Sequence, residues 1–258
     1  MSWQLPLAQL TAVLLGGVRA AAWLSTCPPF NSPVVPAPIK ALLAVALALP
    51  VVGTTTVDAA AIGTDPNRLL IAIVVQVLVG AALGFITALF FAAVQAAGEL
   101  IDLLGGFSMA FAFDPLGMNQ TSVFGRFYHL TAVTLLFVTD GYQLVVRGFL
   151  ESYRALPLTG TLSLSALDRM LTLGVTHMFT AALEIAAPLG AVLFCTDLAL
   201  GLLNRVAPAL NAFSMGFPAK IFLVLSLGGL DLGLLPTAVH NLVVPAVEAV
   251  ITVSGGGR

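Results

Sequence analysis

Two acidic side chains near the middle of the chain lie in an otherwise apolar stretch that is long enough for a membrane helix. Glu99 and Asp102 follow Gln95 at i+4 and i+7, so the three side chains share one face of a helix. On insertion scales a charge at the centre of a membrane helix costs on the order of 2.5–3.5 kcal/mol, so lipid is an unfavourable neighbour. The carboxyl groups could form a catalytic acid pair, but we expect them to face protein or a polar channel instead.

Other residue types that could do chemistry are not arranged for it. His129, His177 and His240 are far apart and have no Glu or Cys at metal-ligand spacing, and Cys27 and Cys195 form no C-x-x-C motif. The sequence also has no P-loop, nucleophile elbow or dinucleotide-binding fingerprint. We therefore predict that the chain is not an enzyme, that it has no catalytic residue, metal site or cofactor, and that it has no structural disulfide.

The segment that follows the two acids is too flexible for a helix and too apolar for a loop in water. It begins with Gly105 and Gly106 and reaches a second turn at Asp114-Pro115. Between these turns it carries three phenylalanines and a methionine, which are unfavourable in contact with water. We expect this segment to be buried, either in protein or in a constriction.

The composition places these residues in a membrane-associated protein. Of 258 residues, 59% are hydrophobic and 9% are charged, whereas roughly a quarter of the residues of a soluble domain are charged. Several apolar stretches reach the roughly 20 residues that cross a bilayer. The sequence therefore predicts an all-α, hydrophobic, multi-helix protein. A formal net charge of -2 provides no basic surface, so no nucleic-acid partner is expected.

Apolar stretches and turn residues divide the chain into expected helices and connections. The expected helices are Leu5–Leu24, Ile39–Pro50, Leu69–Leu104, Val123–Val146 with an interruption at Asp140-Gly141, Met170–Leu203, Ile221–Leu235 and Ala238–Val253. The last two form a hairpin around Pro236, and Pro188 is expected to kink its helix. We expect a proline-rich connector over 28–38 and a loop over Thr159–Asp168. No positive region precedes the first helix, so we expect it to be retained.

The longest expected helix contains no proline and would extend about 54 Å, which exceeds the roughly 30 Å of the hydrocarbon core. It must tilt in the membrane or stand partly inside a protein assembly. Small side chains recur on it every four residues, so another backbone can approach one face closely. These are Gly80, Gly84, Ala88, Ala92 and Ala96. Ordinary helix packing and a specific subunit contact both fit this stripe.

Several blocks of residues resemble the FliR/SctT family of type III protein export gates. The resemblance rests on Gly80–Phe85, Ala97–Gln120, Ala187-Pro188, Asp197–Arg205, Ala207-Pro208, Leu210-Asn211, Phe213 and Gly216-Phe217-Pro218. Order and spacing of these blocks agree over most of the chain. Two departures replace a polar residue by an apolar one: Ala209 stands where the family usually has glutamine, and Leu103 or Leu104 stands where a glutamine commonly precedes the glycines.

The resemblance implies a structural component of an export gate. Members of the family assemble with FliP and FliQ at the heart of the flagellar basal body, in the bacterial inner membrane, where unfolded secreted subunits are threaded across. By this resemblance residues 1–258 form one export-gate domain of long helical hairpins, with a FliP-like part at about 1–160 and FliQ-like hairpins at about 161–258. Further implied partners are FlhB- and FlhA-like export proteins and the ring of the basal body.

The resemblance also assigns roles to particular residues. In the family the glycine-rich loop closes the channel as a plug, and flexible apolar side chains can seal a pore yet re-pack around a passing polypeptide. The residues implied for this plug are Gly105, Gly106, Phe107, Met109, Phe111, Phe113, Asp114, Pro115 and Met118. We assign helix packing or subunit contact to Gly80, Gly84, Ala88, Glu99, Asp102, Asn204, Arg205, Pro208 and Asn211. The alternative for the aromatic rings of the plug is an ordinary place in the core.

There are three alternatives to a flagellar export gate: an injectisome subunit, a secondary transporter and an intramembrane enzyme. The same motifs occur in injectisome gates, so a subunit of that machine also fits the sequence. A polytopic secondary transporter would have two related halves with charged groups that meet near the midplane, and we see no convincing internal repeat. An intramembrane enzyme would need a catalytic set that the sequence lacks.

Overall fold

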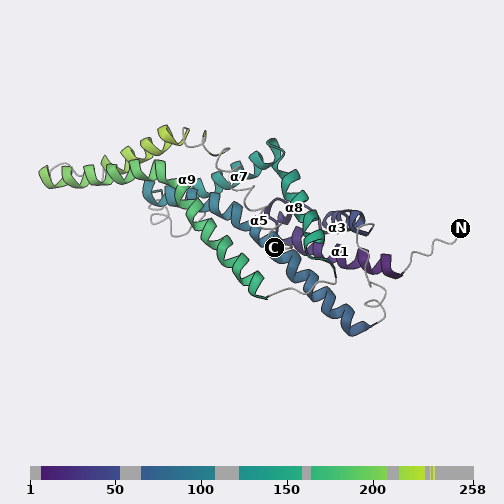
Figure 1. Ribbon diagram of the computed structural model, residues 1–258. Coiled ribbons are helices and arrows are strands. Elements are labelled where there is room, and N and C mark those ends of the chain that lie inside the picture. The colour runs from purple at the N-terminus through teal and green to yellow at the C-terminus, as the bar shows by residue number, and fades with distance from the viewer. Residues whose placement is uncertain are drawn as a thin grey trace, which may run out of the picture. The chain divides into compact units, whose positions relative to one another are not determined.

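The computed structural model describes residues 7–52, 65–107, 122–158, 164–207, 215–229, 233 and 235 (Figure 1). These residues are helical apart from short turns, and none of them lies in a strand. The helices are α1 (Leu7–Thr26), α2 (Pro28–Asn31), α3 (Ala37–Val52), α5 (Pro66–Gly105), α7 (Val123–Val138), α8 (Gly141–Ala155) and α9 (Leu164–Val206), with a further apolar helix at Met215–Gly229. The prediction of an all-α protein is confirmed.

The longest expected helix is present as α5, which has 40 residues and is therefore about 60 Å long. The next expected helix ends earlier than predicted, because α7 stops at Val138 and α8 starts at Gly141. Asp140 between them has a φ of 56°, in the left-handed region that Asp tolerates better than most residues. The Asp140-Gly141 interruption is thus a true helix boundary.

The prediction of a loop over Thr159–Asp168 is wrong for its second half, because α9 already begins at Leu164. Leu164, Ala166 and Leu167 at the start of α9 are good helix formers. The helix continues through Pro188 to Val206. The expected hairpin around Pro236 lies outside the described residues, apart from Met215–Gly229 and two single positions.

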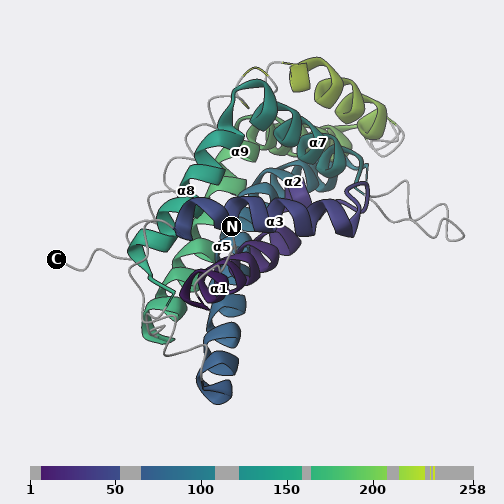
Figure 2. The ribbon, with the colours of Figure 1, turned by 90° about the vertical axis from the view of Figure 1, so that its right-hand side faces the viewer.

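The chain divides into two compact units, and α5 and α9 contribute to both. The described residues of the first unit come from Met1–Leu89 and Tyr142–Val175, and those of the second from Phe90–Gly141 and Thr176–Leu242. In the first unit α1 and α3 lie side by side (Figure 2). Its core contains Trp23, whose ring stacks on Phe149 with centroids 4.4 Å apart.

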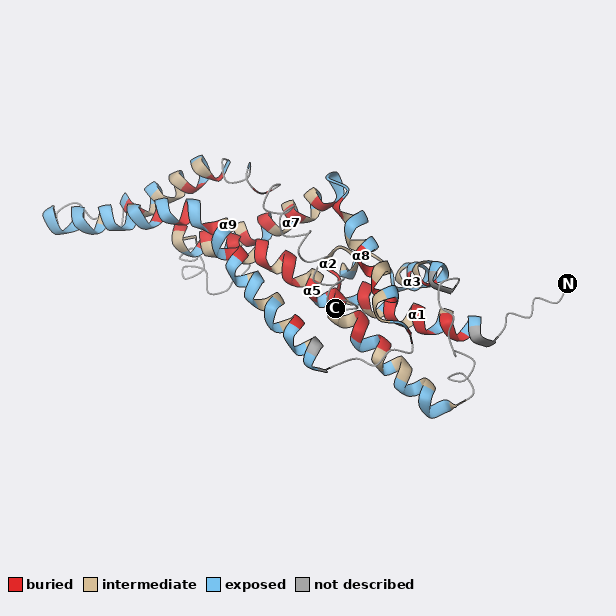
Figure 3. Ribbon diagram, in the orientation of Figure 1, coloured by how far each residue is buried: buried red, intermediate tan, exposed pale blue. Residues whose placement is uncertain are grey.

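Burial differs strongly between helices. The facing sides of α1, α5 and α8 are buried, whereas most of α9 is exposed (Figure 3). Within the described residues, α5 and the part of α9 from Leu167 onward are long and apolar enough to cross a membrane, and α7 with α8 would make a third span if the bent pair is counted as one. The helices that meet the length and composition of membrane spans are thus also among those that leave large apolar side chains uncovered.

Candidate functional site

Asp102 lies at the end of α5 and is almost fully buried, with 3% of its surface exposed. Its carboxyl oxygen Oδ2 accepts a hydrogen bond from the Ser122 hydroxyl and a second one, of 3.0 Å, from the backbone N–H of Phe124. Ser122 and Phe124 stand at the start of α7, where the first backbone N–H groups have no partner within the helix. The carboxylate therefore supplies an acceptor and a negative charge where the helix dipole favours both.

Ser122 is the N-cap of α7. Its hydroxyl oxygen accepts a hydrogen bond of 2.8 Å from the backbone N–H of Gly125, while its proton is donated to Asp102. Sequence reasoning missed this residue, although a serine directly before an apolar helix is a recognisable start signal. The cap and the carboxylate together satisfy donors in the first turn of α7.

The other side of this site is the C-terminal end of α5. The backbone N–H of Phe107 donates to the carbonyl of Asp102 at 3.0 Å, and that of Gly106 donates to the carbonyl of Leu103 at 3.4 Å. This pair of bonds is the Schellman pattern of a helix end. Gly106 has a φ of +82°, which only glycine adopts without strain. The first of the predicted loop residues thus form a defined helix terminus.

The helix Met215–Gly229 packs against this terminus. A Cβ on Gly105 would lie 2.9 Å from Cγ2 of Val224, so no side chain fits there without movement. Lys220 donates from Nζ to the carbonyl of Leu104 at 3.2 Å and forms an ion pair with Asp197 of α9. A cation at the C-terminal end of a helix is favoured by its dipole. The end of α5 is thereby linked to two other helices of the second unit.

The two acids of α5 differ in burial although they share one face of the helix. Asp102 is buried, whereas Glu99 is exposed and accepts a hydrogen bond of 2.9 Å from Nε2 of Gln95. One turn before Asp102 the backbones of α5 and α7 come very close, because a Cβ on Gly98 would lie 2.5 Å from the carbonyl oxygen of Phe124. Sequence reasoning did not select Gly98, since a single glycine in an apolar helix carries no distinctive spacing.

A second polar cluster lies in the core of the first unit. Arg19 has no exposed surface and donates three hydrogen bonds, from Nε to Oε1 of Gln76 at 2.6 Å, and to the carbonyls of Ser152 at 3.1 Å and Leu156 at 2.9 Å. Its guanidinium also lies 4.5 Å from the ring centre of Tyr153. Burial lowers the pKa of Arg19 to about 10, so the side chain stays charged at neutral pH.

Arg19 has no ion-pair partner in the part of the chain that the structure describes. Its charge is instead met by carbonyl oxygens at the end of α8, where the helix dipole is negative. Gln76 extends the cluster by donating from Nε2 to the carbonyl of Leu158 at 3.0 Å. The cluster thus ties α1, α5 and the end of α8 together in one network.

The stripe of small residues on α5 meets α1 of the same chain at its first two positions. A Cβ on Gly80 would lie 2.9 Å from Cβ of Ala22, and one on Gly84 would lie 2.9 Å from the carbonyl oxygen of Trp23. Further along the stripe, Ala88 is half-buried. The close approach that the spacing predicts therefore takes place within the chain at Gly80 and Gly84.

The remaining predicted residues are distributed as follows. Phe107 is half-buried, and its ring packs edge-on against Phe124 with centroids 5.2 Å apart. Asn204 and Arg205 are exposed near the end of α9. Met109, Phe111, Phe113, Asp114, Pro115, Met118, Pro208 and Asn211 lie outside the described residues. The site that the structure defines is therefore the pair of helix ends on either side of the predicted plug loop.

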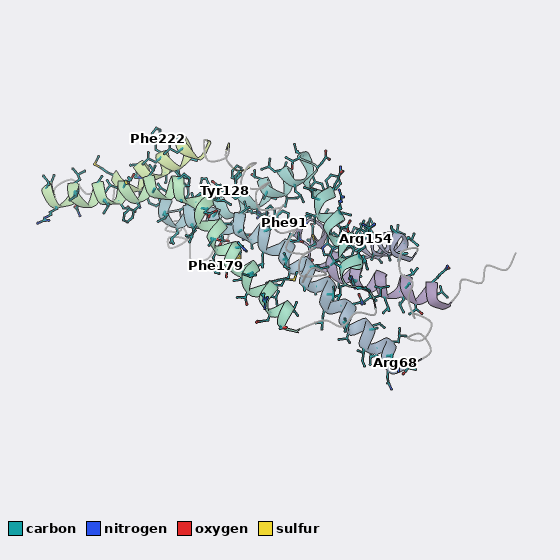
Figure 4. The ribbon with its side chains drawn as sticks, viewed as in Figure 1. Arg68, Phe91, Tyr128, Arg154, Phe179 and Phe222 are labelled. Carbon is teal, nitrogen blue, oxygen red and sulfur yellow. The ribbon has the colours of Figure 1, made fainter. Side chains whose placement is uncertain are left out.

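Aromatic side chains of the second unit differ strongly in exposure, and four of them are labelled in Figure 4. Phe91 and Tyr128 are each 1% exposed, and Phe91 lies 5.9 Å from the ring of His129. Phe179 and Phe222, in contrast, are 60% and 70% exposed. Both cysteines are free, Cys27 buried and Cys195 exposed, and the described ranges contain no group of three or more metal-ligating side chains.

Comparison with known proteins gives a consistent result. Residues 10–244 match the family described as bacterial export proteins, family 1. The chain is 33% identical over 225 residues to the flagellar biosynthetic protein FliR of Pectobacterium carotovorum subsp. carotovorum, which covers 87% of this chain and 85% of that protein. It is 32% identical over 214 residues to FliR of Bacillus subtilis, covering 81% and 82%. The secretion system apparatus protein SsaT of Salmonella typhimurium is 32% identical over 58% of each chain.

Proposed function

The chain belongs to the bacterial export proteins, family 1, and from this membership we propose that it is a subunit of a type III protein export gate in a bacterial membrane. Its relatives that align over most of their length are named flagellar biosynthetic proteins. A flagellar export gate is therefore the first candidate. A subunit of an injectisome is the second, because SsaT and the surface presentation of antigens protein SpaR of Shigella flexneri align over 58% of the chain.

Family membership carries the proposal, and the structure supports a place in a larger assembly through the mismatch between helix length and a bilayer. With 40 and 43 residues, α5 and α9 are about 60 and 65 Å long, about twice the thickness of a hydrocarbon core. Large apolar side chains are exposed along both helices, at Leu70, Ile71, Val74, Val77, Leu78, Phe179, Leu183, Phe194, Leu198 and Leu202. A bilayer core does not cover helices of that length, so we propose that other protein chains cover apolar surface of these helices that lies outside it.

Subunits like FliP and FliQ are the proposed partners, with a FliP-like part at about 1–160 and FliQ-like hairpins at about 161–258. The proposed location is the inner membrane at the flagellar basal body. Further proposed partners there are FlhB- and FlhA-like export proteins, the ring of the basal body and unfolded secreted proteins. In this role the chain binds no nucleic acid or cofactor and catalyses no reaction. It forms part of the passage, and other components of the export machine drive transport.

The proposed mechanism places a movable seal between α5 and α7. The chain leaves α5 through the turn at Gly106, which has a left-handed backbone conformation, and the proposed seal comprises the residues from Gly105 to Met118. Bulky apolar side chains after this turn would fill the passage and re-pack when a substrate enters. Asp102, Ser122 and Lys220 support this proposal, because they hold the two helix ends from which such a seal would extend.

The test of this function is co-expression. Expressed alone, the chain should aggregate, because its apolar surfaces lack their partners; expressed with FliP- and FliQ-like subunits from the same genome, it should yield a discrete complex. Rescue of swimming in a strain that lacks its flagellar counterpart would favour the flagellum, and rescue of effector secretion would favour the injectisome. A monodisperse single chain that transports a small solute would contradict the gate function.

A further inference from the structure

We infer that Asp102 is a positioning residue that holds together the two chain ends flanking residues 108–121, with its backbone carbonyl on one side and its carboxylate on the other. This inference rests on the proposed function only for what the flanked segment does. The linkage itself stands on described residues of the second unit, namely Asp102, Phe107, Ser122 and Phe124.

On the departing side, the carbonyl of Asp102 accepts the backbone N–H of Phe107 at 3.0 Å. Phe107 is the last described residue before the segment. This bond closes the Schellman turn, so the direction in which the chain leaves α5 is fixed relative to Asp102. The ring of Phe107 then packs on Phe124, which adds an apolar contact between the departing and the returning chain.

On the returning side, Oδ2 of the same residue accepts from the Ser122 hydroxyl and from the N–H of Phe124. Ser122 already caps α7 locally, since its hydroxyl oxygen accepts from Gly125. What Asp102 adds is a link across 20 residues of sequence between the end of one helix and the start of the next. Fixing both ends of a segment in this way reduces the conformational entropy that is available to it.

The chemistry of the linkage requires a carboxylate rather than another acceptor. Hydrogen bonds to a charged acceptor are roughly twice as strong as neutral ones, and a negative charge suits the N-terminus of α7. The second oxygen, Oδ1, is buried and has no hydrogen-bond partner among the residues that the structure describes. A buried oxygen without a donor is unfavourable, so the contribution of Asp102 comes from the bonds of Oδ2 and of its backbone.

The test measures the distance between the two helix ends in the complex purified with its partner subunits. Spin labels are attached at Leu103→Cys and Val123→Cys, which are 64% and 57% exposed, in a chain that carries Cys195→Ser. Cys27 is fully buried and is left in place. The parent should give one narrow distance distribution. Asp102→Ala should raise the population of separated ends roughly tenfold, as expected for the loss of charge-assisted hydrogen bonds.

Matched variants separate the linkage from a general loss of structure. Ser122→Ala should broaden the distribution less than Asp102→Ala, and the double variant should broaden it by less than the sum of the two single effects, because one of the two bonds of the Ser122 hydroxyl is to the same carboxylate. Asp102→Asn keeps one acceptor oxygen and should fall between parent and alanine variant. Thr134→Ala removes a hydroxyl of α7 that bonds only to its own helix, at the carbonyl of Leu130, and should leave the distribution unchanged.

A narrow distribution in both Asp102→Ala and Ser122→Ala would overturn the inference. If Asp102→Ala prevents assembly, Ser122→Ala alone decides, since it removes one hydroxyl. Membrane conductance of cells with the same complexes tests the proposed seal separately. Broadening with increased conductance supports both the linkage and the seal, whereas broadening without any change in conductance supports the linkage and contradicts the sealing function.

Discussion

The side chains of Arg19 and Gln76 form a fully buried hydrogen bond of 2.6 Å that joins α1 to α5 in the core of the first unit. Gln76 relays this link to the carbonyl of Leu158, and Arg19 reaches the carbonyls of Ser152 and Leu156 directly. The planar guanidinium has donors in several directions, which suits a site where three separate acceptors must be met at once. The pair is therefore the centre of the polar network that holds three helices.

Replacing Arg19 with Met should destabilise the complex by about 1–3 kcal/mol, because buried carbonyls and Gln76 lose their donor in an apolar core. Arg19→Lys should not restore stability, since an ammonium group cannot reproduce the fork of guanidinium donors. Thermal unfolding of the purified complex measures both effects. The control is Arg154→Met, which removes an exposed i,i+3 ion pair with Glu151 and should change little. A lysine variant as stable as the parent would disprove the geometric explanation.

Replacing Gly84 with Leu should reduce the recovery of folded complex, because a side chain there meets Thr26 and the carbonyl oxygen of Trp23. Gly17→Leu is the matched control, since no atom lies within 4 Å of a Cβ at that position of α1. Recovery is measured by the yield of the complex after size-exclusion chromatography. Equal yields from the two variants would contradict the requirement for close contact between α1 and α5 at Gly84.

Replacing Phe107, Phe111 and Phe113 together with Ala should make the membrane leak while the outer helices still assemble. The triple variant removes most of the apolar volume of the proposed seal, so a passage that excluded water should conduct ions. Conductance, or uptake of small ions and sugars, is measured in cells with equal amounts of complex. A membrane that stays as tight as with the parent would identify these rings as ordinary core and remove the plug from the mechanism.

Lys220→Met and Asp197→Asn should each lower the thermal stability of the second unit, and their effects should not add. Lys220 holds both Asp197 and the carbonyl of Leu104, so either change breaks the same link. Asp197 is nearly half exposed, and we expect a coupling free energy of about 0.5–1 kcal/mol from a double-mutant cycle. Strict additivity would show that the ion pair does not support the end of α5.

The sequence predicted the parts of the fold that depend on periodicity and composition. The length of α5 follows from an apolar stretch without proline, and the all-α class follows from its repetition along the chain. Helix ends were predicted less well, since Leu164 starts α9 inside the expected loop. The position of a helix end depends on local residue types and also on the side chains that pack against that end.

The candidate site was predicted only in part, for a physical reason. Spacing put Glu99 and Asp102 on one helical face, but burial depends on where the start of α7 lies, and no local pattern encodes that. Ser122 could have been found as a helix cap. The partners of Arg19 could not, because they are backbone carbonyls, which every residue possesses and no side-chain motif marks.

The buried Arg19 also constrains the order in which the chain can mature during synthesis. Its carbonyl acceptors lie 133 and 137 residues later in the sequence, so α1 is synthesised well before these acceptors exist. At about 5–20 residues per second, translation reaches those acceptors on the order of 10 s later. During that interval the guanidinium of Arg19 lacks these two acceptors, so the polar network of the first unit cannot be completed before α8 has been made.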